Sequence, residues 1–219
     1  MINYAIEALV RAGISEVMLV TGGTHAGEFL RLLGSGQEHG LERLMYAYQE
    51  KPGGIAEALW LAEKFCGTDP VLVMLADNIV EHSFASSVES FLEQGRGARI
   101  ILTTPEDPTH LKHLGVPELD ATGRILRIVE KPDVPSSRYA VTGIYCYDSE
   151  VWKVIRTLEP SSRGELEITD VNNWYVSAGV MEYDILKGFW GDAGESIDAY
   201  YEVNDFVRSN GANKPVDAS

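Results

Sequence analysis

Positive charge is scarce in this chain of 219 residues. Eighteen Lys and Arg stand against thirty-three Asp and Glu, which gives a formal net charge of -15 and a pI near 4.7. Binding to nucleic acid depends largely on neutralising backbone phosphates with Lys and Arg. We therefore expect no nucleic-acid partner, although a small phosphate ligand needs only local positive charge.

Cysteine and long apolar runs are also scarce. Cys66 and Cys146 are the only cysteines, and their spacing matches neither a metal site nor a disulfide framework. Buried small thiols are the simpler interpretation. No apolar run approaches the roughly 20 residues that cross a bilayer, and the start at Met1 has neither a basic flank nor an apolar signal core. We expect no membrane partner and a cytoplasmic location.

Several common catalytic signatures are missing as well. The five histidines show no metal-ligand spacing and none stands beside an obvious Ser or Cys nucleophile. The glycine-rich stretch 21–27 lacks both the Gly-Lys-Ser/Thr ending of a Walker loop and the Gly-x-Gly-x-x-Gly spacing of a dinucleotide site. The sequence gives little support to a kinase or a dehydrogenase.

The whole chain is 45% hydrophobic and 23% charged. Helical and strand patterns alternate through its first half. Periodicity and turn residues predict helices at 2–10, 24–33, 55–65 and 84–94, and strands at 17–20, 44–48, 71–75 and 98–103. Strands that alternate with helices imply a parallel sheet covered on both faces.

The second half has a different pattern. We predict a hairpin from strands 116–119 and 125–129, further strands at 139–147 and 180–186, and helices at 150–158, 168–178 and 197–207. No internal repeat or linker interrupts the chain. We therefore expect a single α/β domain over 1–219, in which the pattern of helices and strands changes near residue 104.

Ligands of open α/β sheets collect at the carboxyl ends of strands, and three predicted strand ends carry suggestive residues: Thr21–Gly23, Gln49–Gly54 and Asp77–Asn78. The amide of Gln49 suits the edge of a pyrimidine, and Pro52 with Gly54 lets the backbone approach a flat ligand. Taken alone, 51–54 is an ordinary strand-to-helix turn, and the order of the other motifs is what favours a binding site.

Carboxylates and a lysine supply the other candidate chemistry. Asp77 and Asp192 together suit a Mg²⁺ ion that holds a nucleoside triphosphate, although Asp77 is also a possible cap and Asp192 a possible surface-turn residue. Lys131, restricted by the proline that follows it, could place its ammonium on a sugar phosphate, and Glu130 could accept hydrogen bonds from sugar hydroxyls. Glu130–Pro132 is otherwise a solvated strand end.

Five short strings in order resemble one family: Gln-Glu-Lys-Pro-Gly-Gly at 49–54, Leu-Ala-Asp-Asn at 75–78, Glu-Lys-Pro at 130–132, Tyr-Ala-Val-Thr-Gly at 139–143 and Trp-Gly-Asp-Ala-Gly at 190–194. They resemble the sugar-nucleotide pyrophosphorylases, most closely the glucose-1-phosphate thymidylyltransferases. The stretch 163–170 is the longest unbroken match. The resemblance implies a Rossmann-like, three-layer nucleotidyltransferase fold with a mixed sheet.

The resemblance also assigns roles. It implies a nucleotide-binding half at 1–104 and a sugar-phosphate-binding half at 105–219, with Mg²⁺ as the cofactor. The implied metal ligands are Asp77 and Asp192. The implied catalytic residues are Asp77, Lys131 and Asp192; the nucleotide-binding residues are Gln49, Pro52, Gly54 and Asp77; and the sugar-phosphate-binding residues are Gly115, Glu130, Lys131, Val141, Thr142, Gly143 and Trp190.

Two functions follow from the resemblance. The first is a nucleotidyltransferase that joins a nucleoside triphosphate to a sugar 1-phosphate and releases pyrophosphate. We expect dTTP as the triphosphate and glucose 1-phosphate as the sugar phosphate. Uracil would suit Gln49 and Gly54 as well as thymine. The second is a truncated, non-catalytic homologue that binds a sugar nucleotide or assembles with other subunits. Leu114 and Pro117 depart from the pattern of the family and leave the sugar open.

The second function arises because the family opens with a strand and a glycine-rich loop that carries an arginine and a lysine, and this sequence starts after them. Such a strand would lie between the strands that begin near Val17 and Val71. We expect the gap to be closed by direct pairing of those two strands, by a segment of another subunit, or by contacts in a homo-oligomer.

Overall fold

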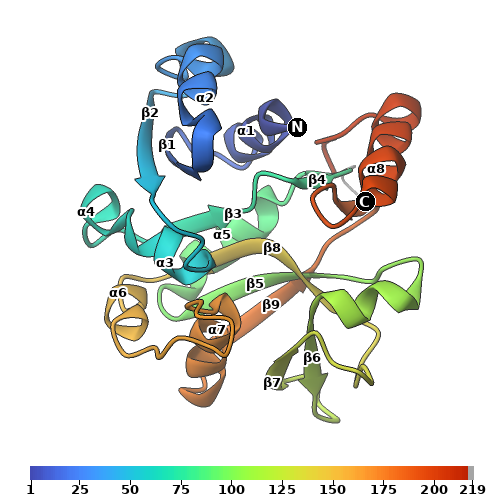
Figure 1. The fold of residues 1–219 in the computed structure, drawn as a ribbon. Helices are drawn as coiled ribbons and strands as arrows, with labels where there is room; N and C mark the ends of the chain where they lie inside the picture. Colours follow the sequence, from blue (N-terminus) through green and yellow to red (C-terminus); the bar gives the residue numbers. More distant parts are fainter. Residues whose placement is uncertain (217–219) are drawn as a thin grey trace.

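The computed structural model describes residues 1–216, apart from the side chain of His25, and shows a mixed α/β fold (Figure 1). Its strands are β1 Glu16–Gly22, β2 Arg43–Gln49, β3 Val71–Met74, β4 Asn78–Val80, β5 Ala98–Thr103, β6 Gly115–Leu119, β7 Ile125–Glu130, β8 Ala140–Tyr147, β9 Met181–Ile185 and β10 Trp190–Asp192. Its helices are α1 Ile2–Arg11, α2 Ala26–Leu33, α3 Ile55–Trp60, α4 Glu63–Cys66, α5 Ala85–Gln94, α6 Val151–Ile155, α7 Ile168–Ser177 and α8 Ile197–Asn210, with short 3₁₀ turns Gly23–His25, Gln37–His39 and Pro108–His113.

The central sheet has the strand order β3-β8-β5-β9. β8 is buried at every position and runs antiparallel to both β3 and β5, whereas β5 and β9 are parallel. The expectation of a parallel sheet in the first half holds for β1 with β2 but was wrong for β3 and β5, because β8 from the second half lies antiparallel between them. The sheet is mixed, as the resemblance implied, and both halves of the chain build it.

A second, two-stranded sheet stands apart from the central one. β1 and β2 pair in parallel over seven positions, from Glu16 with Arg43 to Gly22 with Gln49. Neither strand pairs with β3 within residues 1–216. The expected closure of the gap by direct pairing of β1 with β3 was therefore wrong, and no other described strand lies between them.

A cavity of about 740 Å³ lies at this gap. The facing strands β1 and β3 line it, together with apolar residues of α1 and of α3 and α4. Figure 1 shows the β1–β2 pair with α1 and α2 as an upper lobe above the central sheet. The gap between the strands is therefore a real cavity with apolar walls on several sides.

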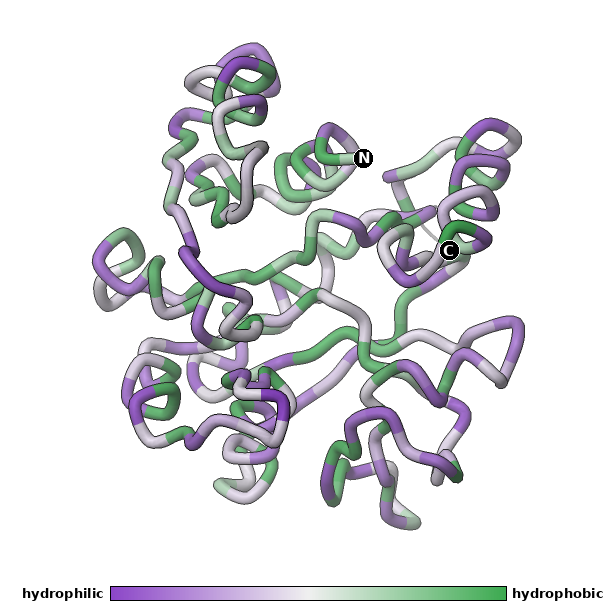
Figure 2. The backbone as a smooth tube through the Cα atoms, viewed as in Figure 1, coloured by the Kyte–Doolittle hydropathy of each residue, from purple (hydrophilic) through white to green (hydrophobic). Residues whose placement is uncertain are grey.

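The main core packs helices against the central sheet. Every second residue of β5 and β8 points to one face of the sheet, and this face supplies Ile100, Leu102, Tyr145 and Tyr147. Helices α6 and α7 cover it. The opposite face packs on α1 and α5 through residues such as Phe84 and Ile101. Figure 2 shows long hydrophobic stretches in the central strands. Helices thus cover both sheet faces, in three layers.

Two predicted helices are shorter or broken. The expected helix 55–65 is interrupted between α3 and α4, where Leu61 and Ala62 donate backbone hydrogen bonds to Ala58 and Leu59, three residues back. Such bonds tighten the turn and end regular α-helix. The helix expected at 150–158 ends at Ile155 for the same reason, because Leu158 donates to Ile155. No described helix has the length and apolarity needed to span a membrane.

Candidate active site

Asp77 and Asp192 meet at the short sheet formed by β4 and β10. Asp192 pairs with Asn78 in the strand register, and the Ala193 amide donates to the Asp77 carbonyl at 3.0 Å. Gly194 separates the two side chains: a Cβ there would overlap Asp77 Oδ2 and stand 3.3 Å from Asp192 Oδ1. A side chain at position 194 would collide with the Asp77 carboxylate, and glycine avoids this collision.

Electrostatics support a cation at this pair. Burial raises the pKa of Asp192, and the negative charge of Asp77 raises it further. Tyr145, fully buried on β8, has its pKa raised by burial and by the charges of Glu130, Asp192 and Asp77. Mg²⁺ typically uses one or two carboxylates and takes its other ligands from water and substrate phosphates. The two carboxylates therefore fit Mg²⁺, although no group of three or more His, Cys, Asp or Glu within residues 1–216 forms a metal cluster.

Asn78 fixes the geometry around the carboxylates. Its side chain is 1% exposed, and its Oδ1 accepts from the Gly143 amide and from Trp190 Nε1, both at 2.8 Å. Its Nδ2 donates to Asp77 Oδ1 at 3.0 Å. One buried amide thus joins Asp77 to β8 and β10.

Gln49, Pro52 and Gly54 line the cavity at the end of β2. Gln49 Nε2 donates to Glu57 Oε2 at 2.7 Å and to the Gly54 carbonyl at 3.2 Å. Gly54 has φ 93°, and a Cβ there would overlap the Leu166 carbonyl. The turn is therefore docked on residues 163–168, from the other half of the chain.

Glu130 and Lys131 line the same cavity from the end of β7. Glu130 pairs with Gly115 in the β6–β7 register, and its Oε2 accepts from the buried hydroxyl of Thr169 at 2.7 Å. Lys131 is exposed and has φ 46°. This left-handed backbone differs from the extended geometry that a following proline favours, so the restriction expected for Lys131 was wrong.

Val141, Thr142 and Gly143 lie side by side on β8 and are buried. The Thr142 hydroxyl donates to the Ile101 carbonyl at 2.8 Å, and Val141 packs in the main core. Gly143 leaves the space that Asn78 Oδ1 and Leu75 occupy. These residues shape the site through their backbone and packing.

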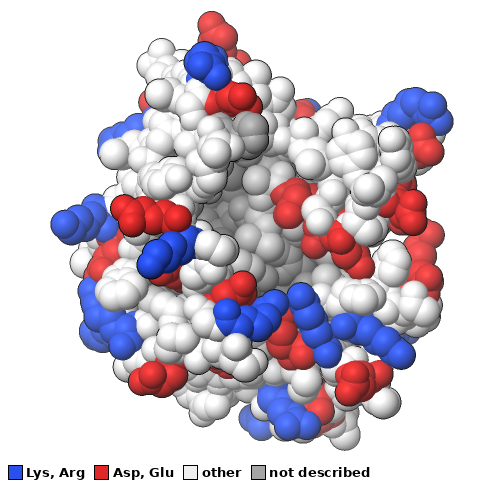
Figure 3. Space-filling model, viewed as in Figure 1, with Lys and Arg blue, Asp and Glu red and all other residues white. Residues whose placement is uncertain are grey.

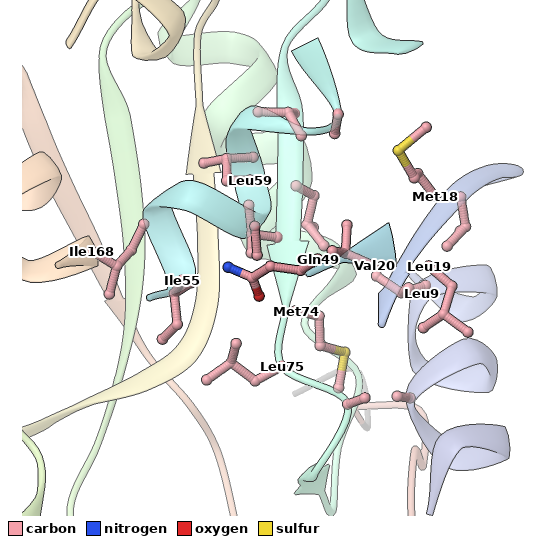
Figure 4. A pocket seen from close by; sticks show the side chains of 18 of the residues that line it. Leu9, Met18, Leu19, Val20, Gln49, Ile55, Leu59, Met74, Leu75 and Ile168 are labelled. Atoms are coloured by element: carbon pink, nitrogen blue, oxygen red, sulfur yellow. The ribbon is translucent and has the colours of Figure 1, made fainter. Parts of the chain in front are cut away.

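The structure brings Gln49, Pro52, Gly54, Glu130 and Lys131 to one cavity, and Ala76 extends its lining to the residue beside Asp77. Figure 4 shows the Gln49 amide projecting among apolar side chains that include Ile55, Leu59, Val20 and Leu75. Charged side chains of both signs surround the hollow seen on this face in Figure 3. The cavity therefore combines the Gln49 amide and apolar side chains with charged residues of both signs, among them Glu130, Lys131 and Arg163.

Sequence reasoning missed three residues of this site. Arg163 lines the cavity and forms ion pairs with Glu167 at 2.9 Å and Glu165 at 3.3 Å. Glu57 and Thr169 hold Gln49 and Glu130 through the hydrogen bonds described above. The motif 163–170 was an available signal for Arg163 and Thr169. No sequence pattern pointed to Glu57.

Comparisons with known proteins show the family to which the chain belongs. The family described as "Nucleotidyl transferase" matches residues 1–210. A glucose-1-phosphate thymidylyltransferase of Actinoplanes sp. is 42% identical over 95% of this chain and 68% of its own length. One from Neisseria meningitidis is 36% identical over 95% of this chain and 72% of its own length.

Solved structures share the fold. The crystal structure named "Putative Glucose-1-Phosphate Thymidylyltransferase from Bacillus anthracis in Complex with a Sucrose" is 44% identical, with a TM-score of 0.86 over 94% of this chain and 82% of that one. A UDP-glucose pyrophosphorylase complexed with UDP-glucose is 22% identical, with a TM-score of 0.79 over 95% of this chain and 86% of that one. The second likeness concerns the fold alone.

Proposed function

The chain belongs to the nucleotidyl transferase family, whose relatives are sugar-1-phosphate nucleotidyltransferases, and from this premise we propose that it joins dTTP to glucose 1-phosphate and releases pyrophosphate. One observation carries the proposal: the Asp77 and Asp192 carboxylates both approach Gly194, beside a cavity that is lined by Gln49 and by Glu130 with Lys131. A nucleobase, a metal-bound phosphate and a sugar phosphate would each find a matching group.

The reaction is an in-line attack of a sugar-phosphate oxygen on the α-phosphate, with pyrophosphate as the leaving group. Such chemistry depends on positioning and on neutralising charge. Lys131 would orient the attacking phosphate, and Glu130, held by Thr169, would accept hydrogen bonds from the sugar. Gln49 would hold the base. Mg²⁺ bound to Asp77 and Asp192 would neutralise phosphate charge.

Pyrophosphate release tests the proposal. Purified protein is incubated with Mg²⁺ and a matrix of dTTP, UTP and CTP against glucose 1-phosphate and galactose 1-phosphate. We expect turnover with dTTP and glucose 1-phosphate, and a loss of roughly 100-fold or more in Asp77→Asn and in Asp192→Asn. Asp198→Asn is the matched control, because Asp198 is exposed on the first turn of α8.

The alternative is a homologue that binds a sugar nucleotide without turning it over. The apolar gap between β1 and β3 supports it, because the absence of strand pairing there, beside Gln49, would weaken the binding of a triphosphate more than the binding of a base or a sugar. No pyrophosphate release in any mixture, together with calorimetric binding of dTDP-glucose, would replace the first proposal with this one. Full activity in both Asp→Asn variants would contradict the assignment of Asp77 and Asp192 as metal ligands.

A further inference from the structure

The hydrogen bonds of Gln49 determine which way its amide faces. Nε2 lies 2.7 Å from Glu57 Oε2 and 3.2 Å from the Gly54 carbonyl oxygen. A carboxylate and a carbonyl oxygen accept hydrogen bonds and cannot donate them. The opposite orientation of the amide would point Oε1 at two acceptors. The chemistry of its partners therefore fixes the NH₂ group toward Glu57.

The backbone makes room for this contact. Glu57 lies in the first turn of α3, and its carboxylate occupies the position that a side chain on residue 53 would need. Gly53 is thus required for Glu57 to reach back to the end of β2. Gly54, with φ 93°, turns its carbonyl toward the same NH₂ group. The Glu57 carboxylate and the Gly54 carbonyl thus accept from the same NH₂ group, and Gly53 leaves room for the carboxylate.

The other side of the amide faces the cavity. Gln49 lines it, and Figure 4 shows the side chain projecting among apolar neighbours such as Ile55 and Leu75. No hydrogen bond to Gln49 Oε1 occurs within the described part of the chain. A base that lies against this amide therefore meets the Oε1 acceptor, with apolar side chains such as Ile55 and Leu75 beside it.

We propose that Glu57 is a positioning residue for base selection: by holding the NH₂ group of Gln49, it restricts that side chain to accepting a hydrogen bond from the base. The N3–H of thymine or uracil is a donor and matches this acceptor. N3 of cytosine is an acceptor and would face Oε1 without a proton between them. The inference rests on the proposed function, because it assumes that the base lies at Gln49.

The selectivity arises from the cost of an unpaired polar contact. A free amide could rotate by half a turn and offer either its oxygen or its NH₂, and would tolerate both pyrimidines. An amide held by Glu57 loses that freedom. Leaving two acceptors opposed in an apolar cavity disfavours cytosine by roughly tenfold or more.

Calorimetric titration with dTMP and dCMP tests the inference independently of turnover. We expect the unaltered protein to bind dTMP more tightly than dCMP by roughly tenfold or more. Glu57→Gln replaces the obligate acceptor with an amide that also donates, so Gln49 regains both orientations. The preference for dTMP should then fall to roughly twofold or less. Glu50→Gln is the matched control, since Glu50 is exposed beside Gln49 and lacks any hydrogen bond or ion pair within residues 1–216.

The outcomes separate the inference from the proposed function. Undiminished preference for dTMP in a folded Glu57→Gln variant overturns the inference and leaves the base site intact. An equal loss of preference in Glu50→Gln also overturns it, because charge alone would then explain the effect. Binding of neither nucleotide to the unaltered protein overturns both. If Glu57→Gln fails to fold by circular dichroism, hydrogen exchange of the Gln49 side-chain NH₂ in the unaltered protein decides: protection supports the inference, and free exchange overturns it.

Discussion

Trp190 donates a hydrogen bond from its indole Nε1 to Asn78 Oδ1 at 2.8 Å, and the same oxygen accepts from the Gly143 amide. This contact joins β10, β4 and β8 at the point where the two candidate metal ligands meet. Asn78 is 1% exposed, so water cannot replace the bonds it makes. The carboxylate pair therefore depends on a neutral, buried amide for its position.

We predict that Asn78→Leu destabilises the protein by roughly 2–3 kcal/mol, because it leaves the Gly143 amide and the Trp190 indole without an acceptor in a buried place. Urea unfolding followed by circular dichroism measures the change. Asn210→Ala is the control, since that side chain is exposed at the end of α8 and should cost less than about 0.5 kcal/mol. Equal stability of the unaltered protein and Asn78→Leu would contradict this account of the site.

A second prediction separates backbone strain from steric collision. Gly54 and Gly164 both have positive φ, at 93° and 77°, but a Cβ on Gly54 would overlap the Leu166 carbonyl, whereas one on Gly164 would meet nothing within 4 Å. Gly164→Ala should cost roughly 1 kcal/mol for its conformation alone. Gly54→Ala should cost at least about 1 kcal/mol more, measured by the same urea unfolding. Similar losses in the two variants would show that the turn can move away from residue 166.

Lys131 has φ 46°, which is unfavourable for a residue with a Cβ. Lys131→Gly and Lys131→Ala remove the same ammonium, but only glycine relieves the conformation. We predict that the glycine variant is more stable than the alanine variant by about 0.5–1 kcal/mol, and that both lose binding of glucose 1-phosphate equally. Thermal unfolding and calorimetry measure the two effects. Retained binding in either variant would show that the sugar phosphate is held elsewhere.

Local patterns predicted most elements of this fold because each depends on neighbouring residues. The periodicity at 2–10 became α1, and the apolar run of 139–147 became β8. Pairing was harder to predict, because the local sequence of a strand that is buried at every position, such as β8, does not indicate its partners or its direction. Nothing in the sequence indicated that it would lie antiparallel between β3 and β5.

In the candidate site, too, features set by neighbouring residues were predicted and features set by distant contacts were not. The strings around Gln49, Asp77 and Glu130 were visible because their residues are consecutive. Glu57 was not, because its contact with Gln49 spans a strand end, two glycines and the first turn of a helix. The left-handed conformation of Lys131 was hidden too, since the following proline predicts an extended backbone and tertiary contacts override that preference.

The reactivity of Cys66 provides a pH-dependent test of the cavity wall. Burial, helped by the negative charge of Asp69, raises the pKa of this cavity-lining thiol to about 11. The thiolate is the reactive form, so alkylation by iodoacetamide should accelerate about tenfold per pH unit between pH 7 and 9 without a plateau. Asp69→Asn should lower the pKa and speed labelling at pH 8. A plateau below pH 9 would mean that the thiol is more exposed than described. Cys146, whose pKa burial raises to about 12, should label more slowly still.

The facing edges of β1 and β3 lead to a final prediction, about association. Within residues 1–216 no strand pairs with these two edges, which lie beside an apolar cavity, and exposed strand edges pair readily with other chains. We predict that the protein self-associates through this gap, measured by light scattering after size-exclusion chromatography. Val20→Lys combined with Val73→Lys places charges in the cavity and should shift the protein to the monomer, because an incoming strand would have to bury them. Leu92→Lys, on an exposed position of α5, should leave association unchanged. If the double variant remains folded and associated, the contact between copies lies outside the gap, and the unpaired edges are not what joins them.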